Sequence, residues 1–216
     1  MKPQPLPVRS QARTAVTRDR IERAALSAFS EVGFDAASTR DIAGRAGVKQ
    51  QLITYHYGTK LELWKAAVDR LFAELREGLA RRMTGLEGVD EPTRIRLMLR
   101  EFLVLSEEHP ELARFMMHES GLPGPRLSWL YERHTKGFFE KMLDRIAWAQ
   151  ERGLAADGDP AHLLYVLIGA TGMFSHPAEA ALMTAGRSRE PESVERYVEL
   201  VLRLILPGVP APETSG

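Results

Sequence analysis

Residues 38–60 read STRDIAGRAGVKQQLITYHYGTK, and their pattern is that of two short helices separated by a glycine. Ser38 or Thr39 can cap a helix at its N-terminus, and Gly47 can end that helix by taking the positive φ of a tight turn. A second short helix is expected over about Gln50 to His56. Two short helices joined through a single glycine turn predict a helix-turn-helix.

Hydrogen-bonding side chains crowd the second of these helices. We expect Val48, Leu52 and Ile53 to hold it against its neighbours, which leaves its amides, hydroxyls and lysine partly outward. Such a helix suits the major groove of DNA, whose base edges offer donors and acceptors, with flanking cations near phosphates. An ordinary helical hairpin with a solvated polar face is the alternative. The predicted DNA-binding residues are Thr39, Arg40, Lys49, Gln50, Gln51, Thr54, Tyr55, His56, Tyr57 and Lys60.

Helices are also expected on both sides of this stretch. Apolar residues recur from Ile21 to Val32 at the spacing of an amphipathic helix, which Gly33 ends. Thr59 and Glu62 have the pattern of a capping box, in which Thr59 caps the next helix and Glu62 reaches back to it. That long helix joins the two predicted domains.

The rest of the chain predicts further helices and no strand. Their expected ranges are roughly 92–107, 110–119, 126–152, 159–175 and 192–206. The predicted fold is therefore all-α, with about nine helices. It consists of a disordered basic arm over 1–16, a three-helix DNA-binding domain over 17–62, a helical effector-binding and dimerisation domain over 63–206, and a disordered tail over 207–216.

Composition and charge narrow the possible functions. The 216 residues include no cysteine, which excludes disulfides and thiolate chemistry. No apolar run is long enough for a transmembrane helix, and the charged N-terminal segment does not predict a secretory signal, so we expect a cytoplasmic protein without a membrane partner. Residues 1–60 carry a net charge of +5 and the remainder −5. A basic end on an acidic body favours a polyanionic partner.

The sequence lacks the common catalytic and metal-binding patterns. None of the six histidines takes part in an H-E-x-x-H zinc motif, and there is no G-x-S-x-G nucleophile motif. The segment IGATG at 168–172 lacks the Lys-Ser/Thr of a phosphate-binding loop. We therefore expect neither an enzyme nor a bound cofactor or metal. The alternative to a DNA-binding regulator is a helical adaptor that binds protein through the exposed short helix.

Residues 18–68 resemble the DNA-binding domain of the TetR family of bacterial transcriptional regulators. The matching blocks are RIERAALSAFSEVGFDAAST, RDIAGRAGV, KQQLITYHYGTK and LELWKAAV, in that order. The remaining two thirds of the chain match the family in length and helical pattern only. The resemblance implies a regulator, most often a repressor, that binds a pseudo-palindromic operator and is released by a small, mostly apolar effector.

One departure from the family pattern lies in the second short helix. The family often has a pair of tyrosines there, and in this chain Thr54 fills the first place and Tyr55 the second. Tyr57 stands where phenylalanine is usual. The role of the helix in the groove carries over, but the operator sequence does not.

The resemblance also implies a homodimer and an effector cavity within residues 92–180. The same apolar side chains could instead form the core of a single subunit. The predicted dimer residues are Leu163, Leu164, Leu167, Ile168, Tyr197, Leu200, Val201, Leu204 and Ile205. The predicted cavity residues are Met98, Phe102, Phe115, Met116, Glu119, Trp129, Phe138, Tyr165, Gly169, Gly172 and Met173.

Overall fold

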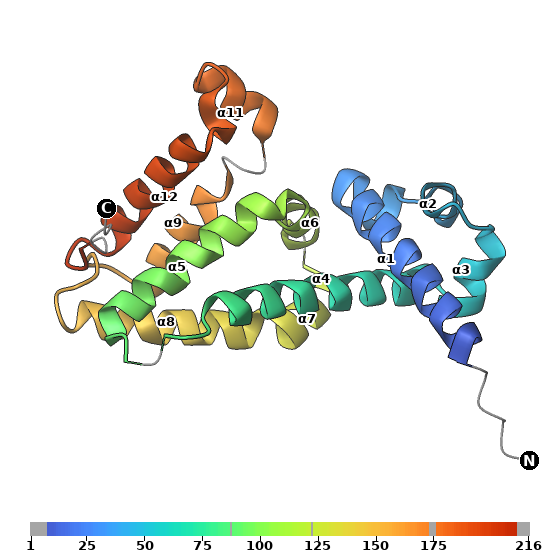
Figure 1. Ribbon diagram of the computed structural model, residues 1–216, viewed down its shortest axis with the longest axis horizontal. Coiled ribbons are helices and arrows are strands. Elements are labelled where there is room, and N and C mark those ends of the chain that lie inside the picture. The colour runs from blue at the N-terminus through green and yellow to red at the C-terminus, as the bar shows by residue number, and fades with distance from the viewer. Residues whose placement is uncertain (1–7, 87, 122, 173–175, 211–216) are drawn as a thin grey trace, which may run out of the picture. The chain divides into compact units, whose positions relative to one another are not determined.

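The computed structural model describes residues 8–86, 88–121, 123–172 and 176–210. Over those ranges every regular element is a helix and none is a strand (Figure 1). The all-α fold is thereby confirmed. The chain divides into two compact units: the first contains the residues up to Glu74 together with Arg114–Gly121, and the second contains Leu75–Ala113 and the chain after Gly121.

The first unit holds the helix-turn-helix. Its helices are α1 (Val8–Ala36), α2 (Thr39–Ala46), α3 (Gln50–Tyr57), the greater part of α4 (Lys60–Arg82) and the end of α6 (Pro110–Ser120).

The core of the first unit forms around Trp64, whose side chain is fully buried. Its ring lies 5.8 Å from that of Phe115 and 6.4 Å from that of Phe34, measured between centroids. Because a buried aromatic pair is favourable beyond its buried area, these rings fix α4 against the end of α1 and the end of α6. Phe115, predicted to line an effector cavity in the second domain, is thus a core residue of the first unit.

α1 begins earlier than the sequence predicts. The arm over residues 1–16 was expected to be disordered. Its first seven residues lie outside the described part of the chain, and from Val8 onward the chain is helical. Residues 8–16 contain neither glycine nor proline, so the packed helix that starts at Ile21 can extend toward the N-terminus without a break. At the other end Gly33 takes φ 76° and ψ 171° and interrupts the helix, as predicted.

α4 begins at a cap that is only half of the predicted box. The Thr59 hydroxyl accepts a hydrogen bond from the Glu62 amide at 3.1 Å. Glu62 does not complete the box, because its carboxylate accepts from the Lys65 ammonium at 2.8 Å and the Thr59 amide donates to the Tyr57 carbonyl. α4 also runs past residue 62, where the predicted functional domains meet, so the compact units and the predicted domains divide at different residues.

The second unit consists of helices around a large apolar core. Apart from the end of α4 and the start of α6, its elements are α5 (Glu91–Glu108), α7 (Pro125–Leu130), a π-helical turn (Tyr131–Thr135), α8 (Lys136–Gln150), α9 (Pro160–Ala170), α11 (Pro177–Met183), a 3₁₀ turn (Arg187–Arg189) and α12 (Pro191–Ile205). The core draws on α5, α8, α9 and α12, through residues such as Leu99, Leu103, Ile146, Leu167 and Leu202.

The helices of this unit differ from the predicted ones in three places. The single helix predicted over 126–152 contains a π-helical turn, in which the Lys136 amide donates to the Tyr131 carbonyl five residues back. α9 ends at Ala170, whereas the helix was predicted over 159–175, of which residues 173–175 lie outside the described part of the chain. α11 was not predicted, because its seven residues are too few to give a periodic signal.

The tail after α12 is partly ordered by packing. It was predicted to be disordered over 207–216, and residues 211–216 lie outside the described part of the chain. Within the described part, Val209 is buried in the core and the Gly208 amide donates to the Leu154 carbonyl at 3.0 Å. The buried guanidinium of Arg96 donates to the Val209 carbonyl at 3.2 Å and also pairs with Glu199. The proline-rich composition of the segment gives no sign of these long-range contacts.

No helix in the described part of the chain is both long enough and apolar enough to cross a membrane. Within the same residues, no three His, Cys, Asp or Glu side chains are grouped as metal ligands would be.

Candidate nucleic-acid interface

The turn between α2 and α3 has the geometry that the sequence predicts. Ser38 caps α2, since its hydroxyl accepts from the Asp41 amide at 3.1 Å. Gly47 takes φ 61° and ψ 40°, and the Val48 amide donates to the Ala43 carbonyl at 3.0 Å. This left-handed cap satisfies the last carbonyls of α2 and lets the chain reverse directly into α3.

α3 presents a polar face and is anchored by two buried side chains, Ile53 and Tyr57. Gln51, Thr54 and Tyr55 are exposed, and Tyr55 exposes 79% of its surface. Leu52 was expected to help anchor α3 but is 37% exposed. The exposed face therefore combines an amide, a hydroxyl, a phenol and one aliphatic side chain, a set that can contact both polar base edges and thymine methyl groups.

Gln50 is held in place by a residue of α2. Its side-chain amide donates to the Thr39 hydroxyl at 3.0 Å. This bond links the start of α2 to the start of α3 and leaves the Gln50 carbonyl oxygen and one amide hydrogen available. Gln50 and Thr39, both predicted DNA-binding residues, are thus brought together before any ligand arrives.

Tyr57 was predicted to face partly outward but does not, and Lys60, predicted to lie near phosphates, is partly buried and bonded within the first unit. Tyr57 is buried, and its hydroxyl donates to the Glu22 carboxylate at 2.9 Å. Burial, together with the Glu22 charge, raises the pKa of Tyr57, so the phenol stays protonated and can donate. Lys60 donates to the Asp35 carbonyl at 3.1 Å and lies 4.6 Å from the centre of the Phe34 ring. Both residues hold the fold of the first unit.

His56 lies between two aromatic neighbours on α3. Its ring centre is 5.0 Å from that of Tyr55 and 6.1 Å from that of Tyr57, with edge-to-face geometry in both pairs. The imidazole is half-buried, whereas Tyr55 is open to solvent. His56 therefore supports the Tyr55 ring from one side and keeps part of its own edge accessible.

Two of the predicted phosphate-binding cations are available. Arg40 and Lys49 are exposed and form no ion pair with a described carboxylate. Lys49 is the N-cap residue of α3, so its ammonium lies at the end of the helix that HTH proteins direct into the groove. Unpaired cations in this position can neutralise backbone phosphates.

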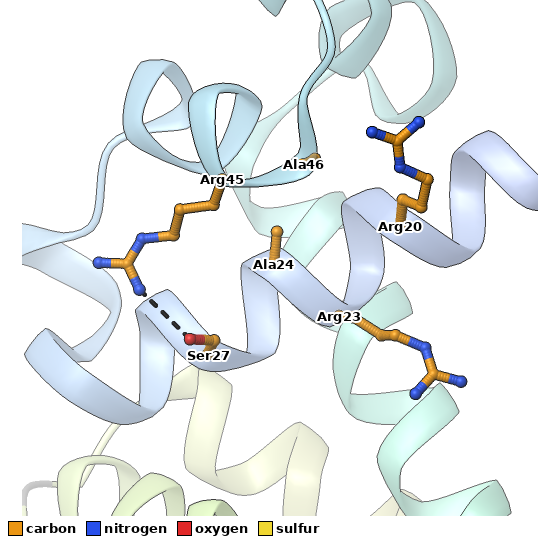
Figure 2. A pocket seen from close by; sticks show the side chains of 6 residues that line it. All are labelled: Arg20, Arg23, Ala24, Ser27, Arg45 and Ala46. Carbon is orange, nitrogen blue, oxygen red and sulfur yellow. Dashed lines mark hydrogen bonds between the residues drawn. The ribbon is translucent and has the colours of Figure 1, made fainter.

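A cleft of about 440 Å³ lies between α1 and α2, and the sequence pattern does not predict it. Figure 2 shows its lining side chains, among which three arginines project from the two helices. Arg45 pairs with Glu31 at 2.8 Å and with Asp41 at 2.9 Å. Arg23 pairs with Asp19 at 3.2 Å. These pairs neutralise most of the positive charge, so the cleft is not a strong anion site.

The predicted effector residues are divided between the two units. Phe115 and Glu119 are buried in the first unit, and Met116 is on the same helix. Tyr165 is 73% exposed and Gly169 is also exposed.

The other predicted cavity residues lie in the second unit. Met98, Phe102 and Phe138 pack beside the core, with the rings of Phe102 and Phe138 stacked at 5.7 Å. The ring centroids of Trp129 and His134 are 5.3 Å apart, and Gly172 is partly buried. Met173 falls outside the described residues.

The predicted dimer stripes are divided between the core and the surface. Leu164 and Leu167 of α9 and Val201 and Ile205 of α12 are buried within the unit. Leu163, Ile168 and Tyr197 are partly buried, and the Tyr197 hydroxyl donates to the Ala170 carbonyl at 2.7 Å. Leu200 and Leu204 remain exposed, by 47% and 61%. Two residues of α9 that were not predicted as dimer residues, Tyr165 and Val166, are exposed as well.

Known proteins share this sequence pattern and this fold. Residues 21–67 match the family model described as "Bacterial regulatory proteins, tetR family". The chain is 26% identical over 187 residues to the HTH-type transcriptional regulator RutR of Escherichia coli K12, covering 86% of this chain and 87% of RutR. It is 27% identical over 153 residues to the HTH-type transcriptional repressor SCO4008 of Streptomyces coelicolor, covering 70% of this chain and 74% of that protein.

A solved structure gives the same fold. The SmeT–triclosan complex superposes with a TM-score of 0.58 at 20% identity, covering 93% of this chain and 97% of that one. The sequence relatives are regulators rather than enzymes, and the structural match extends the agreement in fold to both units. The chain therefore belongs to the TetR family of bacterial regulatory proteins and is a helix-turn-helix transcriptional regulator.

Proposed function

We propose that this protein is a homodimeric repressor that binds a pseudo-palindromic operator through α3 and leaves it when a small, mostly apolar effector binds the second unit. The observation that carries DNA recognition is the exposed face of α3, with Gln51, Thr54 and Tyr55 outward and Ile53 and Tyr57 buried. Because the proposed partner is bacterial DNA, the proposed site of action is the cytoplasm. The competing proposal is an adaptor that uses the same face to bind protein.

If α3 reads the DNA bases, removing its exposed side chains should lower the affinity for a specific duplex. Tyr55→Ala or Gln51→Ala should weaken binding to a duplex selected from random DNA by ~1–3 kcal/mol, because each removes a side chain that contacts base edges. The measurement is a fluorescence-anisotropy titration against the selected duplex and a scrambled one. If the wild-type protein selects no duplex, the adaptor proposal gains; if both variants bind like wild type, α3 does not read the bases.

Lys49→Ala is the matched control for those variants. It removes an exposed cation next to the same helix end, so both duplexes should weaken about equally. The slope of log affinity against log salt should become shallower by about 0.9, the value for one lost phosphate contact. A selective loss for the chosen duplex would instead make Lys49 a base-reading residue.

The dimer proposal rests on apolar surface that a lone subunit exposes. α9 reads PAHLLYVLIGA and has no formally charged residue at neutral pH, yet Tyr165 and Val166 expose 73% and 52% of their surface. α12 adds Leu200 and Leu204, and the two helices pack against each other. A helix that is apolar all round belongs in an interior. A second subunit can supply that interior, and a pseudo-palindromic operator requires one.

The effector proposal rests on a half-buried aromatic set beside the core of the second unit, formed by Phe102, Phe138 and Phe139. SmeT, which shares the fold, has been solved with triclosan. A compound with an apolar body and one polar end suits such a lining.

Effector binding is expected to raise the melting temperature and release DNA together. Stabilisation should reach about 2.7 kcal/mol at a hundredfold excess over the dissociation constant, by mass action. A thermal-shift screen of lipids, aromatic acids and hydrophobic drugs, followed by anisotropy competition with the selected duplex, provides the measurement. Compounds that shift melting without releasing DNA would contradict the regulatory role. A sugar as the sole active compound would contradict an apolar effector.

A further inference from the structure

A chain of polar contacts connects α3 to α4 through α1. It begins at Tyr57, the last residue of α3, whose hydroxyl donates to Glu22 of α1 at 2.9 Å. The second oxygen of Glu22 lies 4.0 Å from the guanidinium of Arg70 on α4. Arg70 returns to α1 through a hydrogen bond to the Asp19 carboxylate. These four residues, Tyr57, Glu22, Arg70 and Asp19, are called the Arg70 relay.

The Arg70 relay is shielded from solvent at its centre. The side chains of Arg70 and Glu22 expose only 14% and 15% of their surface. Hydrogen bonding to Arg70 lowers the pKa of Asp19, which keeps that carboxylate charged. Because charged hydrogen bonds are stronger away from water, the relay can hold α1, α3 and α4 in one arrangement.

The relay also fixes the end of α3 that the Thr39–Gln50 bond leaves free. That bond ties the start of α3 to α2, whereas Tyr57 is the buried anchor at its end. Ile53, the other buried anchor, packs without a directional bond. Among the side chains that anchor α3, Tyr57 therefore adds a directional bond that opposes rotation of the helix at its end. A base-reading helix needs this support, since small errors in placement remove direct contacts.

We propose that Glu22 and Arg70 are positioning residues for operator recognition, which hold α3 in its reading orientation through Tyr57 and make that orientation depend on α4. This inference rests on the proposed reading of DNA by α3. It also gives α4 a role. The helix that carries Arg70 continues to Arg82 in the second unit. A displacement of α4 would therefore move the Arg70 guanidinium relative to the Glu22 carboxylate. Phenylalanine, usual in the family at position 57, has no hydroxyl for such a link.

Two single variants and their combination test the relay. Tyr57→Phe removes the hydroxyl and keeps the ring beneath the Arg18 guanidinium, which lies 5.5 Å from its centre. Arg70→Met removes the charge and keeps an unbranched chain. Each is expected to lower the ratio of affinity for the selected duplex to affinity for a scrambled duplex about tenfold, within the range of measured coupling between sites. The double variant should lose little more than either single, because both changes break one chain.

The affinity ratio separates positioning from simple loss of stability. A variant that is partly unfolded binds both duplexes less and keeps the ratio. Arg82→Met is the matched control, since Arg82 lies on the same helix and pairs with Glu101 at 3.0 Å and Glu108 at 2.6 Å outside the relay. It should leave the ratio unchanged. If Arg70→Met does not fold, Glu22→Gln replaces it, because glutamine keeps an acceptor for Tyr57 without the charge that faces Arg70.

The outcomes distinguish the relay from the proposed function. Unchanged ratios in both single variants, or losses that multiply in the double variant, overturn the relay while α3 remains the reader. Loss of the ratio in Tyr55→Ala but not in Tyr57→Phe likewise overturns the relay and leaves α3 as the reader. A wild-type protein that selects no duplex overturns the relay together with DNA reading by α3.

Discussion

The double substitution of Leu200 and Leu204 by glutamate is expected to give a monomer. Its affinity for the selected operator should be lower by a factor of about one hundred or more. The two leucines expose 47% and 61% of their surface, and two carboxylates there would have to lose their water when a second subunit docks. A monomer keeps one α3, so the second half-site no longer adds its contacts to the same binding event.

Light scattering at micromolar concentration measures the assembly, and anisotropy titration measures the affinity. Circular dichroism checks that the variant keeps its helices, which is expected because neither leucine is in the core. Arg203→Glu is the control, since it adds an acidic side chain to an exposed position of the same helix without removing an apolar one. A double-glutamate variant that remains a dimer would show that subunits associate through another surface.

Glu199→Ala is expected to lower the free energy of unfolding by about 3 kcal/mol, because it leaves a buried guanidinium without its carboxylate. The Arg96 side chain is 2% exposed and pairs with Glu199 across α5 and α12. Its remaining described hydrogen bond, to the Val209 carbonyl, does not neutralise the charge. Urea denaturation followed by circular dichroism measures the loss.

Glu195→Ala is the matched control one helical turn away. Glu195 pairs with Arg100, also between α12 and α5, but the two side chains are 50% and 31% exposed. Water screens this pair, so its loss should amount to less than about 1 kcal/mol. Equal losses in the two variants would mean that Arg96 finds another partner or admits water when Glu199 is removed.

The features predicted well from sequence are those that local chemistry decides. Ser38 as a cap, the left-handed Gly47 and the break at Gly33 follow from the backbone preferences of single residues. The exposure of Gln51, Thr54 and Tyr55 follows from their polar side chains on a short helix whose buried anchors are Ile53 and Tyr57. None of these predictions needed knowledge of a distant part of the chain.

The failures concern residues whose role is decided by distant partners. From the sequence alone Tyr57 resembles a polar residue that contacts the groove. In the structure its hydroxyl donates a hydrogen bond to the carboxylate of Glu22, 35 positions earlier. Phe115, which was predicted as a cavity residue, packs against Trp64, 51 positions earlier, and its role in a cavity stays a prediction. In each case the residue type permits two environments, and only tertiary packing selects between them.

The C-terminal helices show the same limit in a different form. α9 is apolar on every side, so periodicity cannot tell which leucines face the core. The structure buries Leu164 and Leu167 and exposes Tyr165 and Val166. The stripe predicted on α12 mixes core residues with surface residues for a related reason, because Val201 and Leu200 are adjacent and face opposite environments.

Grafting α3 alone onto another helix-turn-helix protein would transfer only part of its sequence preference. The Gln50 side chain is oriented by the Thr39 hydroxyl, which belongs to the preceding helix. In a host with a different residue at that place, the freed amide could rotate and pair with other bases. The shortest segment that keeps the orientation of Gln50 is therefore the continuous one from Ser38 to Tyr57. A host that receives it must still supply partners equivalent to Glu22 and Arg70 for Tyr57.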